Sequence, residues 1–183
     1  IVFVMVARLL RDKGVYEYIE AIKCVSQKIK AQFFLVGAYD FENPSAICEK
    51  EVQGWVEDGY ITYLPPTNDI VSIYERADVI VLPSYREGLS RVLLEAMSCE
   101  RSIITTDVAG CRELCDDGVN GFLVEARDAN TLADAIEKAY VQGKTSLHVN
   151  AKQGREKVVK HYSSDIVCQI YDALIDGVLK KGF

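Results

Sequence analysis

The stretch VFVMVARLLRDKG (residues 2–14) begins with an almost unbroken apolar run and ends in charged residues and a glycine. An apolar run that does not alternate with polar residues is typical of a strand covered on both faces, as in a parallel sheet. The sequence therefore predicts a buried strand here. Similar runs follow at QFFLVG (32–37), ITYL (61–64), VIVL (79–82), SIIT (102–105) and FLV (122–124).

The segments between these runs carry apolar residues at helical spacing. We expect helices over about residues 14–30, 45–58, 69–77 and 90–99, and a short one at 110–115. Strands that alternate with helices in this way indicate a parallel sheet with right-handed crossovers. The predicted fold class is therefore α/β, a Rossmann-like domain of three layers around a six-stranded parallel sheet.

Three more helices are expected after the last strand, at about residues 130–142, 149–161 and 164–180. Asn130 and either Ser163 or Ser164 are the predicted N-caps. The last helix has an apolar stripe, which we expect to face the core; the alternative is that it lies across a neighbouring domain. The stripe consists of Ile166, Ile170, Tyr171, Leu174, Ile175 and Val178.

Composition limits the class of protein. The chain has 183 residues, of which 49% are hydrophobic, enough for one domain with its own core. Its net charge of −6 does not favour a nucleic-acid partner. No apolar run approaches the roughly 20 residues that a membrane-spanning helix needs. The chain starts inside an apolar run without methionine, so we expect a piece of a longer protein.

The cysteines and histidines give no sign of a metal site. Six cysteines are scattered along the chain without a paired CxxC spacing, which favours reduced thiols in the cytosol. His148 and His161 both fall in predicted helices, and we interpret them as ordinary helical residues.

Ligands of open α/β sheets bind beyond the carboxyl ends of the strands, near helix N-termini that favour anions. Arg8 and Lys13 follow the first strand and could bind the oxygens of a diphosphate, although an ordinary solvated turn has the same residues. Gly37, after the second strand, either lets the backbone approach a ligand or simply forms a turn. Pro66, after the third, could form a flat wall of the site.

The stretch YREGLSRVLLEAM (85–97) follows the fourth strand. If a phosphate lies at the start of its helix, backbone N–H groups of residues 88–90 would hold it. Glu87 would then face neutral hydroxyls, and Glu95 could accept the two vicinal hydroxyl hydrogens of a ribose. Without a ligand, Glu87 would only complement the helix dipole and Glu95 would pair with Arg91. Together these positions indicate a nucleotide-sugar site.

REGLSRVLLEAM (86–97) resembles the E-x7-E signature of the retaining glycosyltransferases of family 4, which have the GT-B fold. ARLLRDKG (7–14) resembles the Arg and Lys pair of that family's first loop, and ADVIVLPS (77–84) and DGVNGFLV (117–124) match its strand contexts. The similarity extends from about residue 2 to 175. It implies that residues 1–183 are one donor-binding domain, the C-terminal half of a GT-B fold, without the N-terminal acceptor domain.

The resemblance also implies roles for individual residues. Arg8 and Lys13 correspond to residues that bind the donor diphosphate, and Glu95 to the one that binds the ribose hydroxyls. Glu87 corresponds to the residue that contacts the transferred sugar, so it is the catalytic candidate. Backbone near Gly88, Leu89 and Ser90 would assist with the diphosphate. Apart from the resemblance, Gly37, Pro66 and Arg86 are further candidates for lining the donor site, because they lie in the loops that follow the strands.

The function implied is hexosyl transfer with retention, from a UDP-sugar or GDP-sugar to a glycan or lipid-linked acceptor in polysaccharide biosynthesis. The residues of PSYREGLSRVLLEA (83–96) and TTDVAGCRE (105–113) are most similar to the same segments of family members that add GalNAc or galactose. This similarity favours UDP as the nucleotide of the donor. No cofactor or metal is expected, because two cations and a helix dipole can neutralise the departing diphosphate. The location implied is cytoplasmic, or peripheral at the inner face of the membrane, and the isolated domain is expected to be inactive.

Three other classes of protein are alternatives to a glycosyltransferase. A dinucleotide oxidoreductase is disfavoured, because RLLRDKG (8–14) follows the first strand where G-x-G-x-x-G would be needed. One half of a nucleotide-sugar epimerase and a non-catalytic sugar-nucleotide sensor remain as alternatives. The chain also departs from many family members after the second strand, where VGAYD (36–40) replaces a Gly-x-Gly.

Overall fold

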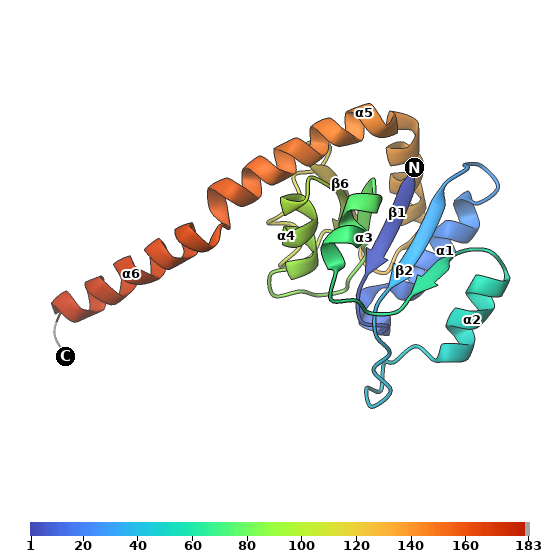
Figure 1. The fold of residues 1–183 in the computed structure, drawn as a ribbon, viewed down its shortest axis with the longest axis horizontal. Helices are drawn as coiled ribbons and strands as arrows, with labels where there is room; N and C mark the ends of the chain where they lie inside the picture. Colours follow the sequence, from blue (N-terminus) through green and yellow to red (C-terminus); the bar gives the residue numbers. More distant parts are fainter. Residues whose placement is uncertain (182–183) are drawn as a thin grey trace.

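Six parallel strands form a sheet in the order β3-β2-β1-β4-β5-β6, which confirms the predicted α/β class (Figure 1). The structure is a computed structural model that describes residues 1–181. All six predicted runs form strands, with ends that differ from the prediction by one residue at most. The strands are β1 (Val2–Val6), β2 (Gln32–Val36), β3 (Thr62–Leu64), β4 (Val79–Leu82), β5 (Ser102–Thr106) and β6 (Gly121–Val124).

Helices cover both faces of this sheet. In order along the chain they are η1 (Arg11–Lys13, a 3-10 turn), α1 (Val15–Val25), α2 (Glu49–Glu57), α3 (Ile70–Arg76), α4 (Arg91–Ser98), α5 (Ala129–His161) and α6 (Ser164–Lys181). Alternate residues of β1 face opposite sides: Phe3 and Met5 pack in the core with α1 and the first half of α5, whereas Val4 packs with α3 and α4. The domain therefore has three layers, as predicted.

The short helix predicted at 110–115 is wrong, because residues 109–114 form successive turns. Gly110 has φ +81°, a left-handed conformation that an α-helix does not contain. Its N–H donates a hydrogen bond to a side chain rather than to a backbone carbonyl, the carboxylate of Glu113 at 2.7 Å.

The two helices predicted at 130–142 and 149–161 are joined in α5, with a break at Gly143 (φ 73°, ψ 169°). The N-cap is Asp128 rather than the predicted Asn130. The Asp128 carboxylate accepts hydrogen bonds from the N–H groups of Asn130 at 2.8 Å and Thr131 at 3.2 Å. Asn130 therefore lies inside the first turn. Ser163 directly precedes α6, as predicted, and its carbonyl accepts the N–H of Val167 at 3.0 Å.

The prediction that the apolar stripe of α6 faces the core is wrong. Figure 1 shows α6 extending away from the sheet, and its side chains at Ile170, Tyr171 and Leu174 are 54%, 63% and 61% exposed. The period of the stripe was correct, but no described element lies opposite it. Within residues 1–181, no helix has the length and apolar character that crossing a membrane requires.

Candidate functional site

The loops that follow β1 and β4 meet at the centre of the sheet. These two strands are neighbours, and the strand order reverses between them, which is where open α/β sheets bind ligands. The carbonyl oxygen of Asp12 accepts the N–H of Tyr85 at 2.8 Å and the hydroxyl of Ser84 at 3.2 Å. Gly14 packs so closely that a Cβ there would lie 2.0 Å from the carbonyl oxygen of Pro83. The two loops therefore form one unit.

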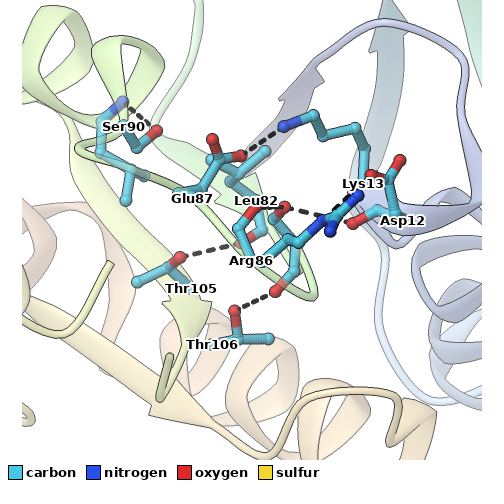
Figure 2. A network of polar contacts seen from close by, with 10 residues as sticks. Asp12, Lys13, Leu82, Arg86, Glu87, Ser90, Thr105 and Thr106 are labelled. Atoms are coloured by element: carbon cyan, nitrogen blue, oxygen red, sulfur yellow. Dashed lines mark hydrogen bonds and ion pairs between the residues drawn. The ribbon is translucent and has the colours of Figure 1, made fainter. Parts of the chain in front are cut away.

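Lys13 and Glu87 are in direct contact across this junction. The Lys13 ammonium lies 2.8 Å from Oε1 of Glu87, and the two side chains are only 19% and 16% exposed (Figure 2). The sequence placed both residues at the same rim, and the structure brings them together as an ion pair. A negatively charged ligand of Lys13 would share this cation with Glu87.

Arg86 and Asp12 form a second, looser pair beside the first. Nε of Arg86 lies 3.9 Å from Oδ2 of Asp12, and the Arg86 side chain is 85% exposed. Oδ1 of Asp12 is buried without a hydrogen-bond partner among the described residues. Because the Arg86 side chain is exposed and its contact with Asp12 is long, its guanidinium can turn toward a ligand above the junction.

A third loop, after β5, supports the loop after β4. Gly110 packs against it so tightly that a Cβ would lie 2.3 Å from the carbonyl oxygen of Gly88. The hydroxyl of Thr105 donates to the carbonyl of Leu82 at 2.8 Å, and that of Thr106 donates to the carbonyl of Ser84. Figure 2 shows these bonds beneath the Lys13–Glu87 pair. The backbone that carries Glu87 is thus fixed from below.

Ser90 is the N-cap of α4, and both of its polar groups are occupied. Its hydroxyl accepts the N–H of Leu93 at 3.4 Å, and its own N–H donates to the carbonyl of Gly110 at 3.1 Å. The amides of Glu87, Gly88 and Leu89 have no hydrogen-bond partner in residues 1–181. The donors available to an anion near this end of α4 therefore include the amides of residues 87–89 but not that of Ser90.

Glu95 lies in the second turn of α4 and is bound from two sides. Its Oε1 lies 3.4 Å from Arg91, the pairing expected for an unliganded helix, and its Oε2 accepts the hydroxyl of Tyr74 at 3.0 Å. Burial, and next the nearby Glu95 charge, raise the pKa of Tyr74, so its hydroxyl keeps the proton. No sequence pattern predicts this contact, because Tyr74 fits the apolar pattern of α3.

Arg8, Gly37 and Pro66 do not contact the Lys13–Glu87 pair. The Arg8 side chain is 61% exposed and binds Asp40, on the loop after β2, at 3.0 Å. Packing within the chain explains why position 37 is a glycine, since a Cβ there would lie 1.7 Å from the carbonyl oxygen of Ala7. Pro66 is exposed in the loop before α3.

Other features of the chain lie away from this junction. A hollow of about 890 Å³ opens between α1, α2 and β2, with Ile22, Phe34 and Tyr60 in its walls. In the part of the chain that the structure describes, no three His, Cys, Asp or Glu residues are grouped to hold a metal ion. His148 and His161 both lie in α5.

Comparison with known proteins places this site in context. The family model of glycosyl transferases group 1 matches residues 1–142. The chain is 34% identical, over 98% of its length and 46% of the relative, to the N,N'-diacetylbacillosaminyl-diphospho-undecaprenol alpha-1,3-N-acetylgalactosaminyltransferase of Campylobacter jejuni. It is 29% identical, over 96% of its length and 46% of the relative, to the capsular polysaccharide biosynthesis glycosyltransferase CapM of Staphylococcus aureus.

A solved structure has the same fold. The Anabaena protein HepE, in complex with UDP and glucose, matches 94% of this chain and 47% of its own with a TM-score of 0.80 and 25% identity. The chain thus spans about half the length of the relatives that it matches.

Proposed function

Because the chain belongs to the glycosyl transferases group 1 family, we propose that it binds the nucleotide-diphosphate sugar donor of a retaining sugar transfer. The observation that carries this proposal is the contact of Lys13 with Glu87 at 2.8 Å, in a loop whose backbone amides at residues 87–89 are unpaired just before α4. A cation and amides on one side can bind a diphosphate, and a carboxylate beside them can face the sugar.

In this arrangement Lys13 and the amides of residues 87–89 hold the diphosphate as it leaves. Interactions that strengthen as charge develops on the leaving group lower the barrier most. Glu87 lies next to the bond that breaks and stabilises the positive charge that develops on the sugar. Arg86 and Arg8 are longer, exposed cations that can reach the donor by changing their side-chain conformation.

The donor we propose is a UDP-sugar. This choice is supported by the UDP and glucose in the HepE complex and by the N-acetylgalactosaminyl transfer in the name of the Campylobacter jejuni relative. The acceptor we propose is a glycan or a lipid-linked oligosaccharide at the cytoplasmic side of a membrane. It would bind to a further domain, a proposal supported by relatives about twice as long as this chain.

Mixing the full-length protein with a UDP-sugar and a lipid-linked or glycan acceptor tests the function. We expect a new glycosidic bond with the anomeric configuration of the donor. Conversion of the free sugar nucleotide to an isomer would instead indicate an epimerase, and binding without either product would indicate a sensor.

We infer that transfer needs no bound metal ion, because Lys13 and the start of α4 can neutralise the diphosphate. Addition of EDTA should therefore leave the initial rate of transfer unchanged. The same assay with added magnesium or manganese ions is the control. A rate that falls with EDTA and returns with either ion would overturn this inference.

Replacing Glu95 by alanine should weaken UDP binding roughly 10- to 100-fold, because it removes hydrogen bonds from the ribose to a charged group, worth about 1.5 to 3 kcal/mol. Isothermal titration calorimetry with UDP measures the change. The control is Arg91→Ala, which removes the exposed partner of the same carboxylate and should change affinity little. Equal affinities of the Glu95 variant and the unchanged protein would exclude the ribose role.

A further inference from the structure

Tyr74 connects α3 to the carboxylate of Glu95 on α4. The Tyr74 side chain is fully buried and packs with Leu93 and Met97 of α4. Its hydroxyl donates to Oε2 of Glu95 at 3.0 Å, across a separation of 21 residues in the chain. The phenol ring is held by the core, so the position of its hydroxyl is fixed.

The other partner of Glu95 holds it far less firmly. Arg91 is 89% exposed and lies 3.4 Å from Oε1, and exposed pairs of this kind contribute little because the side chains remain mobile. The Glu95 side chain is itself 38% exposed, so without Tyr74 its carboxylate would sample several rotamers. The buried hydroxyl selects the rotamer.

We propose that Tyr74 is a positioning residue for the nucleotide: it holds Glu95 in the orientation that accepts the two vicinal hydroxyls of the donor ribose. This inference rests on the proposed function of the site. Tyr74 itself does not touch the ligand. Oε2 accepts one hydrogen bond from Tyr74, which restrains the position of that oxygen, and both oxygens keep lone pairs for the ribose hydroxyls.

A purely structural role makes a different prediction. A buried hydroxyl needs a hydrogen-bond partner, and Glu95 could simply provide one for Tyr74. Loss of the hydroxyl would then loosen α3 against α4 and weaken every nucleotide alike. If Tyr74 positions Glu95 for the ribose, its loss weakens only ligands that have the vicinal diol. The ratio of the affinities for UDP and 2′,3′-dideoxy-UDP separates these two cases.

The experiment is a calorimetric titration of both nucleotides into four proteins: the unchanged chain, Tyr74→Phe, Glu95→Ala and the double variant. We expect Tyr74→Phe to weaken UDP about 3- to 10-fold and to leave 2′,3′-dideoxy-UDP unchanged. The double variant should bind UDP like Glu95→Ala alone, because the tyrosine acts through the glutamate.

Tyr18→Phe is the matched control. Tyr18 is also fully buried, and its hydroxyl donates to the carbonyls of Phe3 at 3.3 Å and Phe34 at 3.4 Å, away from Glu95. Tyr18→Phe therefore removes a buried tyrosine hydroxyl without disturbing the carboxylate of Glu95. The ratio of UDP to 2′,3′-dideoxy-UDP affinity should stay that of the unchanged protein.

The outcomes separate failure of this inference from failure of the proposed function. If Glu95→Ala narrows the affinity ratio but Tyr74→Phe leaves it unchanged, or weakens both nucleotides equally, the positioning role is overturned and the function stands. If the unchanged protein does not bind UDP, or binds both nucleotides equally, the proposed ribose site fails and the inference falls with it.

Discussion

Replacing Lys13 by alanine is expected to lower kcat for sugar transfer about 100- to 1000-fold, the range for loss of one preorganised donor to a developing negative charge. Lys13 is the cation closest to Glu87, and its side chain is only 19% exposed, so water screens its charge poorly. Its contribution should be greatest when the diphosphate leaves, so kcat should fall more than the affinity for the donor. Initial rates over a range of donor concentrations, in the full-length protein, give both quantities.

Two comparisons make this result specific. Lys28→Ala removes another ion-paired lysine, which binds Glu137 and is 61% exposed. The kcat of this variant should equal that of the unchanged protein. Arg8→Ala removes the second cation predicted to bind the diphosphate, which the structure places beside Asp40. We expect a smaller loss there than at Lys13. If Arg8→Ala lowers kcat strongly and Lys13→Ala leaves kcat unchanged, the diphosphate binds over the loop after β2 instead.

Most of the fold follows from the sequence because strands of a parallel sheet are buried on both faces. All four residues of β4 and all five of β5 are buried, and such segments are read directly from apolar runs. The turn at 109–114 and the N-cap at Asp128 were missed because they depend on single residues, a left-handed glycine and a carboxylate two positions before the predicted cap. Periodicity also shows that one face of α6 is apolar, but not what covers that face.

The candidate site was predictable to a similar degree. Lys13 and Glu87 follow two different strands, and topology alone brings the carboxyl ends of neighbouring parallel strands to the same edge. The contacts of Arg8 with Asp40 and of Glu95 with Tyr74 were not predictable. Each joins side chains far apart in the sequence and depends on rotamers and on the packing of two elements, which no local pattern encodes.

Replacing Gly14 by alanine is expected to lower the free energy of unfolding by about 3 kcal/mol or more, from backbone strain plus overpacking. Gly14 has φ +79°, and an added Cβ would lie 2.0 Å from the carbonyl oxygen of Pro83. The neighbour is backbone, so it can yield only if the loop after β4 moves away from the loop after β1. Chemical denaturation measures the loss, and UDP binding should weaken with it because Lys13 and Glu87 separate.

Substitutions at two other glycines separate the contributions of backbone strain and of overpacking to this loss of stability. Gly59 has φ +77° but nothing within 4 Å of an added Cβ, so Gly59→Ala should cost only the left-handed strain, about 1 to 2 kcal/mol. Gly54 lies inside α2, also with open space around it, and Gly54→Ala should stabilise the protein by about 0.5 to 1 kcal/mol. If Gly14→Ala costs no more than Gly59→Ala, the contact with Pro83 does not hold the two loops together. The Lys13–Glu87 junction would then depend on the hydrogen bonds of Asp12 instead.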